Sequence, residues 1–143
     1  MAVDVEKVFD RLEWSYLYEV LDTYDFPKEI IQLIKTIYKS PKAYVYSKGI
    51  LSDAIQITRG TRQGCPLSPS LFALAVEPLA QKIRQSDKIS GINIGGECYK
   101  LGLYADDMML YLTNIEKSIP YLMKIIEQYS KISGYKMNFY LVK

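Results

Sequence analysis

Residues 101–112, Leu-Gly-Leu-Tyr-Ala-Asp-Asp-Met-Met-Leu-Tyr-Leu, decide the fold and carry the most unusual chemistry of the sequence. Two adjacent aspartates, Asp106 and Asp107, interrupt a stretch that is otherwise uncharged and mostly apolar. This pattern predicts two strands joined by a tight turn near Ala105. Like charges beside a buried sheet repel each other and lose hydration, so a divalent cation is a natural counter-charge. Taken alone, the pair fits a solvated hairpin turn equally well.

The sequence on both sides of this hairpin predicts further strands and helices. Strands are expected over residues 2–6, 43–46, 54–58, 91–94, 97–104, 108–112 and 135–140. Helices are expected over residues 11–24, from Pro27 to before Ser40, over 69–85 with a kink at Pro78, and from Thr113 or Ser118 to Gly134. This order predicts an α+β fold, in which an antiparallel sheet has helices packed on one side.

Composition excludes several classes of site. The 143 residues fit one domain and contain no histidine, and Cys65 and Cys98 lie far apart. His-based catalysis and most zinc sites are therefore excluded, which leaves carboxylates, hydroxyls and lysine for any chemistry. The longest apolar run, residues 71–76, is too short to span a membrane, and no secretory signal opens the chain. We expect neither membrane insertion nor secretion.

Charge is distributed unevenly along the chain. Residues 1–27 carry seven acidic and two basic side chains, whereas residues 28–62 carry seven basic and two acidic ones. Acids beside a basic stretch suit a protein that holds metal ions near a polyanion. Solvated helix faces explain the same asymmetry equally well, so charge alone does not assign a function.

Two further segments add candidate site residues. Asp4 lies within a strand pattern, where Asp is disfavoured, whereas Asp10 fits a helix cap. If the Asp4 strand lies beside the 101–112 hairpin, its carboxylate and those of the hairpin could hold two divalent ions roughly 4 Å apart, as in nucleotidyl transfer. Residues 59–69, Arg-Gly-Thr-Arg-Gln-Gly-Cys-Pro-Leu-Ser-Pro, form a loop whose glycines permit close backbone approach and whose Arg and Gln side chains could donate to phosphates or bases. A simple helix-entry loop, with Ser68 as cap and Pro69 as first residue, is the alternative.

Taken together and in this order, these segments resemble the reverse transcriptase family, most closely the polymerases of LINE-type (non-LTR) retrotransposons. Residues 4–10 resemble motif A, residues 59–69 motif B, residues 104–107 the Y-x-D-D box of motif C, and residues 133–138 the start of motif D. The resemblance covers residues 1–143 as one reverse transcriptase domain. It implies the palm of that fold, an antiparallel sheet with helices on one face, with partial fingers and no thumb.

The resemblance also implies a role for each matching residue. Asp4, Asp106 and Asp107 would be catalytic and would ligate two Mg²⁺ or Mn²⁺ ions, with the backbone carbonyl of Val5 as a further candidate ligand. One ion would lower the pKa of the primer 3′-hydroxyl, and the other would stabilise the pyrophosphate leaving group. The resemblance also implies substrate-binding residues. Phe9 would be the aromatic steric gate that excludes a ribose 2′-hydroxyl. Arg59, Gln63 and Gly64 would lie in the loop that contacts the incoming nucleotide and the template, and Tyr104 would lie near the primer terminus.

The implied partners are an RNA template with its primer and deoxynucleoside triphosphates (dNTPs), and family analogy places the protein in the nucleus or cytoplasm. Basic side chains outside the motifs could also contact the template backbone, or could simply form a solvated helix face: Lys35, Lys39, Lys42 and Lys48. The amino-acid sequence of residues 59–69 favours the LINE branch over a group II intron-type or telomerase-like polymerase.

Two departures from the family pattern bear on activity. The family usually has a lysine three residues after the motif D asparagine, where this sequence has Leu141, with Lys143 two residues later. The chain also begins near motif A and ends in motif D, so most of the fingers and the thumb are expected to lie outside it. The alternative to an active polymerase is therefore a catalytically inactive palm remnant that only binds RNA or a protein partner.

Overall fold

The computed structural model describes the backbone of residues 2–6, 8–104 and 107–140, with side chains over 9–104 and 107–138. Its helices are α1 (Val8–Arg11), α2 (Trp14–Thr23), α3 (Lys28–Ile37), α4 (Ser68–Gln85) and α5 (Ile115–Ser133). Its strands are β1 (Ala2–Glu6), β2 (Lys42–Ala43), β3 (Tyr46–Ser47), β4 (Ile50–Leu51), β5 (Ile55–Gln56), β6 (Ile92–Ile94), β7 (Glu97–Tyr99), β8 (Leu101–Tyr104), β9 (Asp107–Leu110) and β10 (Lys136–Tyr140).

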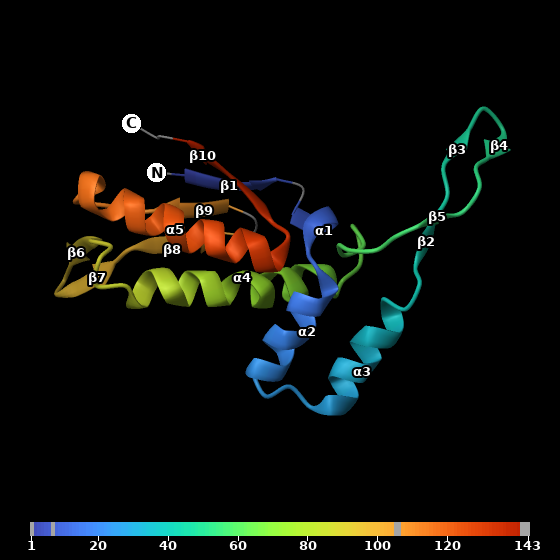
Figure 1. Cartoon of the computed structure of the whole chain (residues 1–143), viewed down its shortest axis with the longest axis horizontal. Helices are drawn as coiled ribbons and strands as arrows, with labels where there is room; N and C mark the ends of the chain where they lie inside the picture. Colours follow the sequence, from blue (N-terminus) through green and yellow to red (C-terminus); the bar gives the residue numbers. More distant parts are fainter. Residues whose placement is uncertain (1, 7, 105–106, 141–143) are drawn as a thin grey trace.

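A four-stranded antiparallel sheet, in the order β10-β1-β9-β8, lies beside helices α4 and α5 (Figure 1). Side chains alternate between its faces along β9, where Met108 and Leu110 are buried and Asp107 and Met109 are exposed. One face of the sheet is therefore packed against the core, and the other is accessible. The α+β class and the antiparallel sheet are confirmed.

Helices α2 and α5 pack against α4, and buried residues of α3 join the same core. Pro78 lies inside α4, which continues through it although proline has no N–H to donate to the preceding turn. The neighbouring carbonyl of Ala75 accepts hydrogen bonds from Tyr16 of α2 at 2.9 Å and from Tyr129 of α5 at 3.0 Å. These two phenol groups tie both neighbouring helices to α4 at the same point.

An arm of two short β-ladders, residues 42–56, extends away from the helices and the four-stranded sheet (Figure 1). Strand β2 pairs with β5 at its base, and β3 pairs with β4 at its tip. The expected pair of strands at 43–46 and 54–58 is therefore interrupted. Large apolar side chains on the arm are exposed: Tyr44, Val45, Tyr46, Ile50, Leu51 and Ile55.

Several local expectations for helices are wrong. The helical periodicity of residues 28–38 predicts an apolar inner face that includes Ile30, Ile34 and Ile37. Ile30 and Ile37 are instead 42% and 50% exposed, whereas Ile31 and Ile34 are buried and belong to the core. The periodicity of residues 122–132 likewise predicts Ile132 on the inner face of α5, but its side chain is 60% exposed, because the buried stripe continues from Tyr129 to Ser133.

The helix starts also differ from the expected ones. Asp10 lies inside α1 and is not the N-cap of α2, which begins at Trp14 with Glu13 as its N-cap residue; the N–H of Glu13 bonds to the carbonyl of Ser133. Ser68 is the first residue of α4, and its hydroxyl donates to the carbonyl of Arg62 at 2.7 Å. Asn114, and neither Thr113 nor Ser118, caps α5 by accepting from the N–H of Lys117. No helix in the described part of the chain has the length and apolar character needed to cross a membrane.

Candidate functional site

The register of the four-stranded sheet brings candidate site residues into one row. Tyr104 of β8 is paired with Asp107 of β9, Asp107 with Asp4 of β1, and Asp4 with Asn138 of β10. Residues directly opposite each other in an antiparallel pair have Cβ atoms about 4.5–5.5 Å apart. The backbone positions of Asp4 and Asp107 are thus adjacent although they are far apart in sequence.

This row crosses the accessible face of the sheet. The described side chains Tyr104, Asp107 and Asn138 are exposed, with Tyr104 83% exposed, whereas Met108, the next residue along β9, is fully buried. Carboxylate oxygens are the ligands preferred by Mg²⁺ and Mn²⁺, so the row has suitable donors in Asp4 and Asp107. Asp106, expected to complete the set, and Leu141 lie outside the described residues, as does the Asp4 side chain. Among the side chains that are described, no group of three or more Asp, Glu, His or Cys is close enough to hold a metal ion.

Phe9, expected to be the steric gate, lies in the short helix α1 that follows β1. Its ring is partly buried and lies 6.3 Å, centroid to centroid, from the ring of Phe72 in α4. The carbonyl of Phe9 accepts a hydrogen bond from the N–H of Thr61, in the loop at residues 59–69. The gate candidate is therefore held by α4 through its ring and by the loop through its backbone.

Close packing at Gly60 fixes the start of this loop. Its N–H donates to the carbonyl of Leu12 at 2.8 Å, and its carbonyl accepts from the indole Nε1 of Trp14 at 2.7 Å. With φ of +87°, a Cβ at this position would lie 2.6 Å from the carbonyl oxygen of Phe9. Only glycine fits this approach, which joins the expected motif A to the expected motif B.

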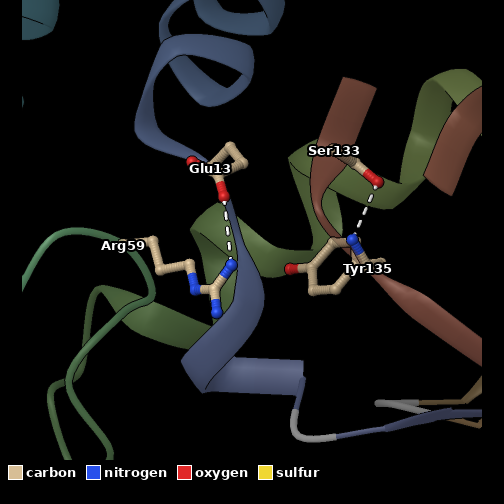
Figure 2. Close-up of polar contacts among 4 residues, drawn as sticks. All are labelled: Glu13, Arg59, Ser133 and Tyr135. Atoms are coloured by element: carbon tan, nitrogen blue, oxygen red, sulfur yellow. Dashed lines mark hydrogen bonds and ion pairs between the residues drawn. The ribbon is translucent and has the colours of Figure 1, made fainter. Parts of the chain in front are cut away.

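The remaining loop candidates differ in their surroundings. Arg59 reaches Glu13, with 3.5 Å between Nη1 and Oε1, as Figure 2 shows. Both side chains are well exposed, so this ion pair contributes little to stability. Gln63 and Gly64 are exposed, and a Cβ on Gly64 would meet nothing within 4 Å. This end of the loop has the free space that a ligand would require.

The segment that carries Glu13 is also held from its other side. Beyond the Glu13–Ser133 backbone bond, a Cβ on Gly134 would lie 2.5 Å from the carbonyl oxygen of Arg11. The hydroxyl of Ser133 accepts from the N–H of Tyr135 at 3.3 Å at the start of β10 (Figure 2). Residues 11–13 therefore lie between the loop and the junction of α5 with β10.

The sequence assigned no site role to Trp14, which falls within the helix expected over residues 11–24, or to Asn138, which was noted only as part of a motif. The hydrogen bond from Trp14 to the loop has no signature in local periodicity. The place of Asn138 beside Asp4 could have been found only by pairing the expected first and last strands.

Comparison with known proteins identifies relatives over nearly the whole chain. Residues 1–139 match the sequence model of the family described as reverse transcriptase (RNA-dependent DNA polymerase). The chain is 35% identical over 112 residues to an uncharacterized 149 kDa protein of transposon TX1 from Xenopus laevis, an alignment that covers 77% of this chain and 8% of that protein.

Two further relatives are retrovirus-related Pol polyproteins. That of the type-2 retrotransposable element R2DM from Drosophila melanogaster is 28% identical over 136 residues, covering 95% of this chain and 12% of the polyprotein. That of the type-1 retrotransposable element R2 from Nasonia vitripennis is 29% identical over 108 residues, covering 76% and 10%. The chain thus spans between 8% and 12% of the length of these relatives. The resemblance to LINE-type reverse transcriptases is confirmed.

Proposed function

The chain belongs to the reverse transcriptase (RNA-dependent DNA polymerase) family, and from this we propose that residues 1–143 form one palm-type domain of the RNA-directed DNA polymerase of a non-LTR retrotransposon. The observation that carries the proposal is the pairing of Asp4 with Asp107 at the accessible face of the sheet. The reaction is transfer of a nucleotide from a dNTP to a primer 3′-hydroxyl.

Asp4, Asp106 and Asp107 are the proposed metal ligands and catalytic residues. Directly opposed residues of an antiparallel pair carry their side chains on one face, so the carboxylates of Asp4 and Asp107 are suited to share cations. Two bound Mg²⁺ or Mn²⁺ ions supply Lewis-acid activation of the primer hydroxyl and stabilisation of the leaving pyrophosphate. The aspartates hold and orient these cations, and without them the adjacent negative charges would repel each other.

The substrate side of the proposed site is built from Phe9, the loop and Tyr104. Phe9 restricts the space at the sugar, and its fixed ring and backbone support that role. Arg59, Gln63 and Gly64 contact the incoming dNTP and the template, for which the open end of the loop leaves space. Tyr104, next to Asp107 and exposed, contacts the primer terminus.

The RNA template with its primer is the proposed macromolecular partner. Exposed lysines at the end of α3 and on the arm provide positive charge for its phosphates: Lys35, Lys39, Lys42 and Lys48. Such contacts position a nucleic acid without reading its sequence. Salt should therefore weaken template binding.

Primer extension tests the proposed function. The chain is incubated with oligo(dT) annealed to poly(rA), dTTP, and Mg²⁺ or Mn²⁺. We expect extension that is lost in Asp106→Asn and retained in Asp87→Asn, an exposed carboxylate in the turn after α4. Absence of extension by the unsubstituted chain, with template binding intact, would contradict the polymerase proposal and favour an inactive RNA-binding module.

A further inference from the structure

We propose that Trp14 is a positioning residue for sugar selection, because it holds the loop at Gly60 against the backbone of Phe9. This inference rests on the proposed function, in which Phe9 is the steric gate. Trp14 does not act on the substrate itself. It acts through the peptide groups of Gly60 and Thr61.

A short hydrogen-bonded path links the indole to Phe9. Trp14 Nε1 donates to the carbonyl of Gly60 at 2.7 Å, and the next N–H along the chain, that of Thr61, donates to the carbonyl of Phe9. Because the Gly60 carbonyl and the Thr61 N–H belong to one peptide unit, the orientation that satisfies Trp14 also satisfies Phe9. Thr61 is buried, so water does not readily replace either bond.

The indole is itself held in place. Its ring lies 5.4 Å, centroid to centroid, from the ring of Tyr38, at an interplanar angle of 31°. Tyr38 is the buried C-cap residue of α3 and precedes the arm (residues 42–56) in the sequence, whereas Gly60 follows the arm. Trp14 therefore contacts residues at both ends of the segment that carries the arm.

The backbone at Phe9 is closely packed against the loop. A Cβ on Gly60 would overlap the carbonyl oxygen of Phe9 and the backbone of Asp10, so these two backbone segments are already in contact. The ring of Phe9 packs against the ring of Phe72. A gate that rejects one additional hydroxyl depends on such close placement, because a loosened aromatic ring can retreat from it.

Nucleotide discrimination tests the proposal. The ratio of kcat/KM for dATP to that for ATP is measured on an oligo(dA) primer annealed to poly(rU). Trp14→Phe keeps an aromatic ring against Tyr38 but removes the Nε1 donor, and we expect the ratio to fall roughly fivefold to tenfold, as for loss of one hydrogen bond. Tyr16→Phe is the matched control, because it also removes an aromatic donor to a backbone carbonyl, and it should lower stability without changing the ratio.

A second measurement does not need catalysis. Trp14 is the single tryptophan of the chain, so its emission reports on this contact. Gly60→Ala forces the loop away from Phe9 and should shift the emission to longer wavelength and increase acrylamide quenching. Gly64→Ala, at a similar φ of +78° but with nothing near its Cβ, should change neither. Equal emission in both variants would contradict the proposed contact.

The outcomes separate this inference from the proposed function. Extension with dATP and an unchanged dATP-to-ATP ratio in Trp14→Phe would overturn the role of Trp14 and leave the polymerase proposal standing. Absence of dATP extension by the unsubstituted chain would overturn both, because sugar selection then has no reaction on which to act. A ratio that falls equally in Trp14→Phe and Tyr16→Phe would show a general loss of structure and overturn the inference alone.

Discussion

Asp4 of β1 and Asp107 of β9 are direct partners in an antiparallel ladder, and Asp107 has Tyr104 as its partner on the other side. Like charges opposite each other destabilise a sheet. Repulsion between the carboxylates of Asp4 and Asp107 therefore destabilises the fold, and bound divalent cations would reduce this repulsion. Stability of this chain should rise when such ions bind, as for any ligand that prefers the native state.

Two buried tyrosines should respond in opposite ways to removal of their hydroxyl groups. Tyr16 donates to the carbonyl of Ala75, whereas the Tyr135 hydroxyl has no hydrogen-bond partner in the described part of the chain. Tyr16→Phe should lower the free energy of unfolding by about 1 kcal/mol, because it breaks a buried bond. Tyr135→Phe should leave that free energy unchanged or raise it, because an unpaired buried hydroxyl is costly. Urea unfolding followed by circular dichroism measures both, and an equal loss in the two variants would contradict the assignment.

Alkaline pH should destabilise the fold through its buried phenols. Burial raises the pKa of Tyr16, Tyr129 and Tyr135 above the ordinary value. In the unfolded chain these groups ionise near pH of about 10, so above that pH the unfolded state binds fewer protons and the free energy of unfolding falls as pH rises. The contribution is fully present below that pH. Unfolding free energies measured from about pH 8 to pH 11 should decline less steeply in Tyr129→Phe than in the unsubstituted chain, and parallel profiles would argue against this linkage.

Two glycines with nearly equal backbone angles should differ in their tolerance of alanine. Gly134 has φ of +80° and its Cβ would lie 2.5 Å from the carbonyl oxygen of Arg11, whereas Gly49, with φ of +83°, has nothing within 4 Å. Both substitutions place a Cβ in the left-handed region, at a cost of about 1 kcal/mol. Gly134→Ala should lose roughly 2 kcal/mol more, because α1 and the α5–β10 junction must separate. The difference between the two unfolding free energies is the measurement, and similar values would show that the close approach at Gly134 is not required.

Much of the fold was predictable because its signals are local. The alternation along residues 2–6 and the apolar residues on both sides of Asp106-Asp107 predict strands, and Gly134 ends α5 in the left-handed conformation expected of a C-terminal glycine. The buried face of α3 was not predictable, since every isoleucine on that helix is a plausible core residue by periodicity. Only the packing of α3 on α2 distinguishes Ile31 and Ile34 from the exposed Ile30 and Ile37.

The candidate site also contains features that local sequence predicts and features that it does not. Composition and strand pattern drew attention to Asp4 and Asp107, but their adjacency depends on β1 lying between β9 and β10. This arrangement is non-local: the resemblance to a known family implied that the aspartates lie close together, but it did not give the strand order. The contacts of Trp14 with Gly60 and Tyr38 are also non-local and add a constraint that neither the motifs nor the periodicity contain.

Counting bound Mn²⁺ tests most directly whether Asp4, Asp106 and Asp107 form a metal site. Electron paramagnetic resonance measures the ions bound per chain in the presence of primer, template and dNTP. We predict two ions, as the nucleotidyl-transfer arrangement requires, with loss of at least one in Asp4→Asn and in Asp107→Asn and no change in the exposed control Asp87→Asn. An ion count that is the same in Asp4→Asn, Asp107→Asn and the unsubstituted chain would contradict the site.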